Sequence, residues 1–209
     1  MNKYSKIFIG GLVCLFFFLS FDRFSIEKTI ISRFETTRYP IYTYYQPLTN
    51  SIDFELLQIL QIWAYAFYAH GFYPIVLNKN SIRTRTNLDE LVKTFSSFPT
   101  VNPKNYELNC YLRWIALAER GGGILMDYDI LPMLHSNSKQ LIELKNSTHQ
   151  QLITYKNLIP MIARGNVRQI NKWIDYMLNF NLSNTNLING KRHISDMITH
   201  AVSFFNILA

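Results

Sequence analysis

Hydrophobic and polar positions alternate with two different periods along the chain. Short runs rich in aromatic and β-branched residues are typical of buried strands, and they occupy residues 40–47, 73–78, 124–126 and 151–155. Longer stretches place apolar residues every three or four positions, as helices do, and they cover 53–69, 87–98, 103–120, 166–180 and 194–208. A strand, a helix and a second strand follow one another between residues 40 and 78. This order predicts a βαβ unit and an α/β fold with a mostly parallel sheet.

The first long helix carries signals at both of its ends. Asp53 is a suitable N-cap, and Gly71 is a suitable stop signal. Between them, apolar residues recur at helical spacing, at Phe54, Leu57, Ile62, Ala66 and Ala69. These signals predict one continuous helix over residues 53–69.

The helix expected at 103–120 is apolar on nearly every side. The remaining stripe is narrow and consists of Asn109, Arg113, Ala116 and Arg120, of which all but Ala116 are polar. A helix that is apolar all round is buried, so this stripe faces either a strip of solvent or a cavity. In a cavity, Arg113 would present its planar guanidinium fork to hydroxyls or phosphate oxygens.

The most informative segment follows that helix. Three glycines precede the apolar run 124–126, and Asp127 and Asp129 come next, separated by Tyr128. In an extended segment, side chains alternate between faces, so we expect the two aspartates to point one way and Tyr128 the other. Two carboxylates at a strand's end suit Mn²⁺ or Mg²⁺ better than zinc, and such an ion can clamp a diphosphate. The alternative is a turn, with one aspartate capping it and the other solvated.

A known family shares this arrangement. The run Arg-Trp-Ile-Ala-Leu-Ala-Glu-Arg-Gly-Gly-Gly, followed by Asp-Tyr-Asp, lies between Arg113 and Asp129. It resembles the central motif of DXD-type glycosyltransferases of the GT-A fold. The nearest group contains yeast α-mannosyltransferase-like enzymes and glycosylating bacterial toxins. Its pattern is Asp-x-x-Arg on a helix, then Gly-Gly, an apolar-aromatic strand and Asp-x-Asp.

The resemblance implies a Rossmann-like nucleotide-sugar-binding domain with a central, mostly parallel sheet, and specific roles for several residues. Asp129 would bind Mn²⁺ or Mg²⁺ directly, Asp127 would contact ribose and metal-bound water, and Arg113 would reach the sugar of a UDP- or GDP-sugar donor. The anomeric configuration would be retained. One residue departs from the family pattern, because the helix aspartate falls on Cys110. That change removes a carboxylate expected to contact sugar hydroxyls.

Four further residues are candidates for donor binding, and each has a structural alternative. Gly122 and Gly123 let the backbone approach a ligand or pack tightly on the sheet. Tyr44, like its neighbour Tyr45, stacks on a nucleotide base or belongs to the core or rim. Asn78 bonds a ribose or base edge, or begins a turn. His193 and His200 are candidates to complete a metal shell, although neither has a spacing that requires this role.

The N-terminal region differs from the rest of the chain. Lys3 and Lys6 precede an apolar run at 7–21, which predicts an N-terminal apolar helix. Residues 1–22 are therefore a signal anchor or a signal peptide, and the anchor is favoured because 18–20 is a poor cleavage site. We expect a stem at 23–37 and the glycosyltransferase-like domain at 38–209, either compact or short at its C-terminal end. The basic flank would stay cytoplasmic. The domain would then be luminal, on a single-pass type II protein of the ER or Golgi membrane, or secreted after cleavage.

Composition and charge limit the possible partners. The chain has 209 residues, of which 48% are hydrophobic, so one domain with a sizeable core is expected. Its formal net charge of +7 favours a nucleotide-diphosphate donor or a phospholipid surface, or reflects an ordinary lysine-rich surface. The basic residues are scattered among apolar ones, so no nucleic-acid partner is expected. Cys14 and Cys110 lie in different elements and are not expected to pair.

These observations predict a metal-dependent glycosyltransferase that moves a sugar from a nucleotide-diphosphate donor to a luminal glycan, protein or lipid acceptor. No residue is assigned as a catalytic base or nucleophile. The first alternative is a catalytically degenerate GT-A-like binding protein, which Cys110 favours. The second is a metal-dependent phosphohydrolase using the same carboxylates. That chemistry recruits further acidic or histidine ligands, and no second acidic cluster stands out among the 14 acidic residues.

Overall fold

The computed structural model describes residues 39–48, 53–133, 139–146, 152–154, 162–180, 187–188 and 191–196. The expected anchor or signal peptide and the stem lie outside these residues. No helix in the described ranges is long and apolar enough to cross a membrane. Residues 194 and 195 are not helical, and most of the helix expected at 194–208 lies outside the described part.

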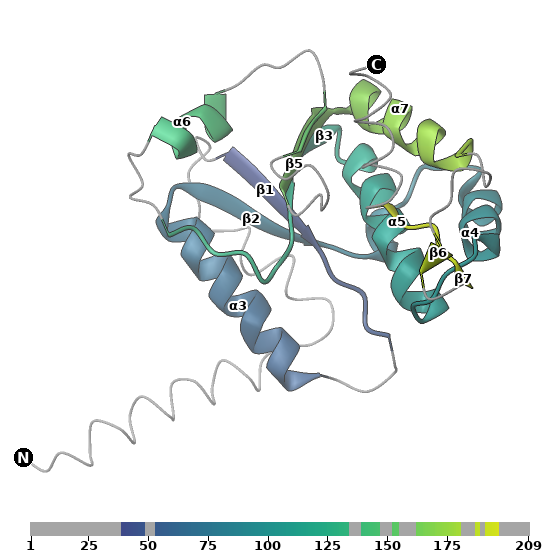
Figure 1. The fold of residues 1–209 in the computed structure, drawn as a ribbon. Coiled ribbons are helices and arrows are strands. Elements are labelled where there is room, and N and C mark those ends of the chain that lie inside the picture. The colour runs from purple at the N-terminus through teal and green to yellow at the C-terminus, as the bar shows by residue number, and fades with distance from the viewer. Residues whose placement is uncertain are drawn as a thin grey trace, which may run out of the picture. The chain divides into compact units, whose positions relative to one another are not determined.

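A five-stranded sheet forms the centre of the domain (Figure 1). Its strands are β1 (Tyr39–Tyr44), β2 (Phe72–Leu77), β3 (Gly122–Met126), β4 (Ile153–Thr154) and β5 (Ile162–Asn166), in the order β2-β1-β3-β5-β4. β1 pairs in parallel with β2 and β3, whereas β5 is antiparallel to both β3 and β4. Only β5 therefore opposes the other strands of this sheet, and the predicted α/β class with a mostly parallel sheet is confirmed. A separate small sheet contains β6 (Leu187–Ile188) and β7 (Lys191–Arg192).

Helices lie on either side of the sheet in Figure 1. They are α3 (Phe54–Ala69), α4 (Leu88–Ser97), α5 (Lys104–Glu119), α6 (Lys139–Asn146) and α7 (Val167–Leu178), with the short 3₁₀ helix η1 at Lys79–Ser81. Strand residues alternate between two cores. Tyr42 and Leu125 join the larger core with α4, α5 and α7, while Ile41 and Ile124 join the smaller core with α3 and α6. The sheet therefore has two buried faces, as expected of an α/β domain.

Local sequence signals explain most helix boundaries. The Asp53 carboxylate accepts a hydrogen bond from the Leu56 N–H at 3.1 Å, and Gly71 has φ +81° just after α3. The Asn166 and Gln169 side chains form a reciprocal capping box at the start of α7. The helices predicted at 53–69, 87–98, 103–120 and 166–180 are confirmed to within two residues at each end.

Two details differ from the sequence pattern. Phe54 and Ile62, which helped to identify α3, are exposed, and the buried residues of that helix are Leu60, Trp63 and Phe67. Trp63 and Phe67 lie four residues apart on one face of the helix, and this face packs in the smaller core. Strand β5 was not expected, because its sequence Ile-Ala-Arg-Gly-Asn lacks a clear alternation of apolar and polar residues.

Candidate functional site

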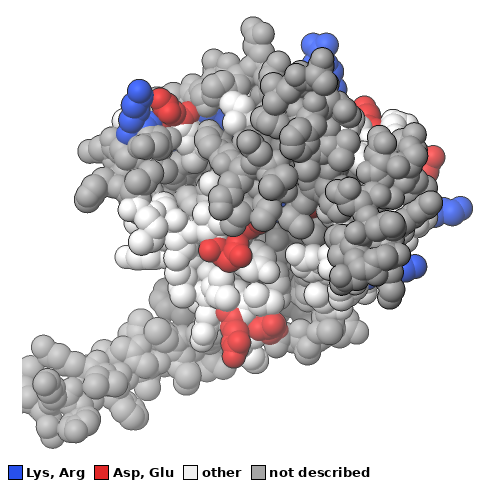
Figure 2. Space-filling view, in the orientation of Figure 1, with Lys and Arg blue, Asp and Glu red and all other residues white. Residues whose placement is uncertain are grey.

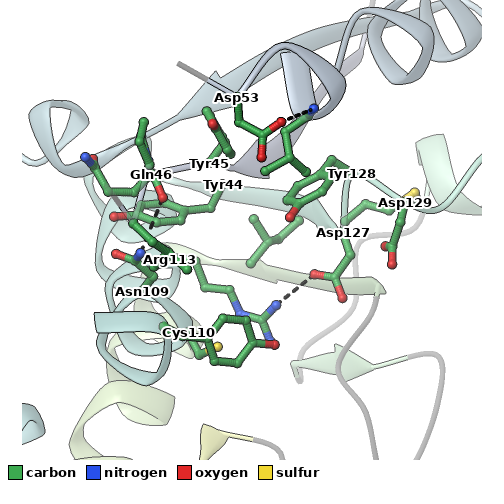
Figure 3. Close-up of a pocket in the computed structure, with 16 residues that line it drawn as sticks. Tyr44, Tyr45, Gln46, Asp53, Asn109, Cys110, Arg113, Asp127, Tyr128 and Asp129 are labelled. Atoms are coloured by element: carbon green, nitrogen blue, oxygen red, sulfur yellow. Dashed lines mark hydrogen bonds and ion pairs between the residues drawn. The ribbon is translucent and has the colours of Figure 1, made fainter. Parts of the chain in front are cut away.

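A cavity of about 430 Å³ lies at the carboxyl ends of β1 and β3, beside α5 (Figure 3). It is lined by residues 44–48, Asp53, Leu56, Tyr106, Asn109, Cys110, Arg113 and residues 125–129. Because β1 and β3 are adjacent and parallel, the segments that follow them meet at the same edge of the sheet. Ligands of open α/β sheets bind at this edge.

The segment after β3 forms a turn rather than an extension of the strand. β3 ends at Met126, and the Ile130 N–H donates to the Asp127 carbonyl at 3.2 Å. Asp127 and Asp129 both line the cavity, but Tyr128 lines it as well. The expected alternation, with Tyr128 on the opposite face, is wrong because the backbone has left the extended conformation before it reaches this residue.

Arg113 connects the cavity to the C-terminal segment. Its side chain is 12% exposed, and one terminal nitrogen binds Asp127 at 2.8 Å. The other terminal nitrogen binds Asp196, which also accepts the Trp114 indole N–H at 3.1 Å. Of the two sequence alternatives for Arg113, the structure supports the cavity. Nothing in the spacing of the chain pointed to Asp196, which lies 83 residues further on.

Burial and neighbouring charges shift the pKa of Asp127 in opposite directions. Burial raises the pKa of Asp127 to about 6, Arg113 works to lower it, and Asp129 and Asp196 add to the rise. Burial works to lower the pKa of Arg113, but Asp196 and Asp127 outweigh this effect and raise it. Arg113 is therefore a permanent cation, whereas Asp127 changes its protonation near neutral pH.

Cys110 occupies the position at which the family resemblance expects an aspartate. It lies in the cavity wall, and burial raises the pKa of its thiol to about 12, with Asp196 as the next cause. The thiol is therefore neutral at pH 7. A neutral thiol is a weak hydrogen-bonding group, so this part of the wall is less polar than a carboxylate would make it.

Aromatic side chains form another part of the wall. Tyr45 and Tyr128 meet edge to face, with ring centroids 6.2 Å apart. Tyr44 also lines the cavity, yet most of its side chain belongs to the larger core. Tyr45 and Tyr128 are therefore better placed than Tyr44 to meet a ligand.

The other candidates for donor binding lie elsewhere. Gly122 and Gly123 do not line the cavity. A Cβ on Gly122 would lie 2.4 Å from the Gly165 carbonyl oxygen, and one on Gly123 would lie 2.8 Å from the Tyr42 ring. The two glycines thus take the structural alternative, which is tight packing on the sheet. Asn78 is also absent from the lining and begins η1, where its side chain accepts the Ser81 hydroxyl at 3.4 Å.

The histidines contribute nothing to this cavity within the described part of the chain. His193 is buried and accepts the Val101 N–H through Nδ1 at 3.3 Å, and it does not line the cavity. His200 lies outside the described residues. His70 lies at the end of α3, with Nδ1 2.7 Å from the Ala66 carbonyl oxygen.

A family model described as "Domain of unknown function (DUF8765)" matches residues 26–206. The chain belongs to this family. No curated protein and no solved structure matches it. The DUF8765 match spans every described residue, including those of the cavity and Asp196.

The described basic side chains do not form one patch on the face of the DUF8765 domain that Figure 2 shows. On the face shown in Figure 2, blue Lys and Arg side chains are scattered along the periphery, and red Asp and Glu side chains lie both there and near the centre. The formal charge of +7 is therefore not gathered into one patch on the described part of this face.

The donor set of the cavity suits a hard divalent cation. The Asp127 side chain is 34% exposed, and Asp129 is exposed at the rim. Both offer carboxylate oxygens, which Mn²⁺ and Mg²⁺ prefer. Among the described residues no cation pairs with Asp129, whereas Asp127 forms an ion pair with Arg113. The carboxylate of Asp129 is therefore more available to a cation than that of Asp127.

Proposed function

We propose that this DUF8765 protein is a metal-dependent glycosyltransferase of GT-A type, with a nucleotide-diphosphate sugar as donor. One observation carries the proposal: Asp127, Asp129 and Arg113 line a single cavity at the carboxyl edge of a mostly parallel sheet. The cavity volume of about 430 Å³ lies within the range of small-molecule sites. The resemblance of residues 110–132 to the DXD family supports the same function.

Each side chain has a distinct role in this proposal. Asp129 and Asp127 would hold Mn²⁺ or Mg²⁺, which supplies positive charge to the departing diphosphate when it is bound. Arg113 donates hydrogen bonds to the donor, and its guanidinium is oriented by Asp196 and Asp127. Tyr45 and Tyr128 provide aromatic surface for the base. The acceptor is a glycan, a protein or a lipid, and residues 1–22 tether or export the domain along the secretory route.

The strongest rival is a DUF8765 protein that binds a nucleotide-sugar without turning it over. Two observations favour it. The neutral thiol of Cys110 stands where the family has a carboxylate, and Arg113 already pairs with Asp127. A binding protein would retain affinity for the donor but would not hydrolyse it in the absence of acceptor.

Calorimetric titration of the full-length chain in detergent tests the proposal. UDP- and GDP-sugars are added with and without Mn²⁺ to the wild type, to Asp129→Ala and to the matched control Asp175→Ala, an exposed aspartate on α7. We expect binding that needs the metal, disappears in Asp129→Ala and survives in Asp175→Ala. Binding that persists at full strength in Asp129→Ala would refute the assignment. Release of free sugar from the bound donor then separates an enzyme from the binding protein.

A further inference from the structure

A second group of ligand atoms lies on α5, one helical turn from Arg113. Glu107 and Cys110 are three residues apart and therefore share a face of the helix. Asp196 reaches this face from the C-terminal segment. One carboxylate oxygen of each acid and the Cys110 sulfur all lie within 4.8 Å of one another.

Glu107 is not satisfied by its protein neighbours. Its side chain is almost fully buried, since the residue is 3% exposed. One carboxylate oxygen accepts hydrogen bonds from Asn102 at 2.9 Å and from Thr100 at 3.3 Å. The other, Oε1, is buried and has no hydrogen-bond partner among the residues that the structure describes. Buried carboxylate oxygens without a partner are costly and uncommon, so Oε1 is available to a cation or to a proton.

We propose that Glu107, Cys110 and Asp196 bind a divalent cation of the Zn²⁺ or Co²⁺ class, at a site separate from Asp127 and Asp129. A thiolate with two carboxylates suits such borderline ions, whereas the carboxylate-only pair suits Mn²⁺ or Mg²⁺. The two sites are divided by Arg113, which binds Asp127 and Asp196 through different nitrogens.

The distances and the charges are compatible with this ion. In tetrahedral zinc sites, sulfur and oxygen ligands lie about 3.6 Å apart. Because the three ligand atoms already lie within 4.8 Å of one another, closure around the ion requires a shift of at most roughly 1 Å. Binding replaces the thiol proton of Cys110, which leaves for solvent as the metal–sulfur bond forms. The thiolate and the two carboxylates are then balanced by the dication together with the Arg113 guanidinium beside Asp196.

The cavity offers the ion a way in. Cys110 is the member of the group that lines the cavity, while Glu107 and Asp196 are buried behind it. Three protein ligands with access from a cavity resemble catalytic rather than closed structural zinc sites. The competing occupant is a proton on Glu107, which satisfies the same oxygen without any metal.

Cobalt titration distinguishes the metal from the proton. Co²⁺ is added anaerobically to the full-length chain carrying Cys14→Ser, because Cys110 is then its only thiol. A thiolate–cobalt ligand bond produces a charge-transfer band in the near ultraviolet. We expect this band to saturate at one equivalent, to disappear when Zn²⁺ is added and to accompany proton release. It should be absent in Cys110→Ser and should need at least tenfold more Co²⁺ in Glu107→Gln.

Asp129→Ala serves as the matched control, because it removes a carboxylate of the other proposed site and should leave the cobalt band unchanged. The absence of a band in the Cys14→Ser chain overturns the proposal and favours a proton on Glu107. An unchanged cobalt affinity in Glu107→Gln also overturns it, and this test does not depend on how Cys110→Ser folds. Neither result depends on whether the protein transfers a sugar.

Discussion

The two ends of β3 have different surroundings, although only a few residues separate them: one is tightly packed and the other opens on the cavity. At the amino end, the backbone of Gly122 is so close to β5 that an added Cβ would lie 2.4 Å from the Gly165 carbonyl oxygen. At the carboxyl end, Asp127 and Asp129 line a cavity of about 430 Å³. The motif that combines glycines with aspartates therefore packs tightly at one end and lines a cavity at the other.

Packing at the amino end of β3 also fixes the position of the aspartates at its carboxyl end. Gly123 packs against the Tyr42 ring of β1, and Gly122 packs against β5. These contacts fix β3 between its two neighbours in the sheet. The position of Asp127, directly after the strand, follows from that alignment. The glycines thus act on the site through the sheet and not through contact with a ligand.

The largest loss of folding stability is expected for Gly122→Ala, at the amino end of β3. Gly122 has φ +89°, which costs an L-residue about 1–2 kcal/mol, and overpacking against backbone adds about 1–3 kcal/mol. Because three backbone atoms lie within 2.8 Å of the added Cβ, we expect a total loss near the upper end, about 4 kcal/mol. Urea unfolding of the full-length chain measures this free energy.

Gly121→Ala is the matched control for this prediction. Gly121 has a similar φ of +86°, but no atom lies within 4 Å of its added Cβ. Only the conformational cost of about 1–2 kcal/mol remains. Equal losses in the two variants would mean that close packing is not what requires Gly122.

The second prediction tests whether the residues at the carboxyl end of β3, called the ligand end below, also stabilise the fold. Arg113→Met leaves the carboxylates of Asp127 and Asp196 without their shared cation. Breaking a buried ion pair costs about 3–5 kcal/mol, and we expect about 3 kcal/mol because Asp127 is partly exposed. Arg168→Met, at an exposed position at the start of α7, is the control and should change stability by less than about 0.5 kcal/mol.

The pH dependence of the same variant has a definite sign. The pKa of Asp127 is about 6 in the folded protein and about 4 in the unfolded chain. The folded state therefore binds the proton more tightly, and the contribution of Asp127 to stability is lost as pH rises from about 4 through about 6. Arg113 works to lower the pKa of Asp127. Its removal therefore raises this pKa further and makes the loss of stability with rising pH larger. The gap between wild type and Arg113→Met should therefore be smallest near pH 4 and largest above pH 6. A gap independent of pH would indicate that Arg113 stabilises only by packing.

Local sequence signals were enough to place the carboxyl end of β3, whereas its amino end begins at Gly122, two residues before the expected strand at 124–126. The helix before it was predicted at 103–120 and is found at Lys104–Glu119, and the run 124–126 lies in β3. Helical period, a glycine stop and a short apolar run are all properties of neighbouring residues. The resulting placement of Asp127 and Asp129 at the carboxyl edge follows from them.

Long-range partners could not be predicted in the same way. Strand β5 is held by pairing on both of its edges, which compensates for a sequence without strand-like alternation. Asp196 reaches Arg113 across 83 residues, and no spacing rule connects the two. On α3, apolar residues lie on every side, so the period identified the helix but not its buried face, which is set by Trp63 and Phe67.

The third prediction isolates the ligand end. Asp129→Asn removes an exposed charge, so the free energy of unfolding should change by less than about 0.5 kcal/mol. Metal-dependent donor binding should weaken about 100-fold, or about 2.7 kcal/mol, because a direct cation ligand is lost. Calorimetry with Mn²⁺ and the donor measures the change.

Asp53→Asn makes the same chemical change in the same cavity wall. Asp53 caps α3 through its carboxylate, and asparagine is an equally good N-cap. We expect metal-dependent binding to remain within about threefold of wild type, which is less than 1.4 kcal/mol. Similar losses in both variants would mean that the cavity needs negative charge in general and has no particular cation ligand at Asp129.

The smallest effect concerns the aromatic part of the cavity. Tyr45→Leu removes the ring that meets Tyr128 edge to face. Stacking of a base on an aromatic side chain contributes about 1–3 kcal/mol, and we expect about 1 kcal/mol because Tyr128 remains. The nucleoside diphosphate should therefore bind roughly fivefold more weakly, whereas pyrophosphate with Mn²⁺ should bind as in the wild type. Tyr65→Leu, at an exposed position on α3, should change neither affinity. Equal weakening of both ligands by Tyr45→Leu would place Tyr45 beside the phosphates instead of the base. The cavity would then not be divided into a metal-binding part at Asp129 and a base-binding part at the two tyrosines.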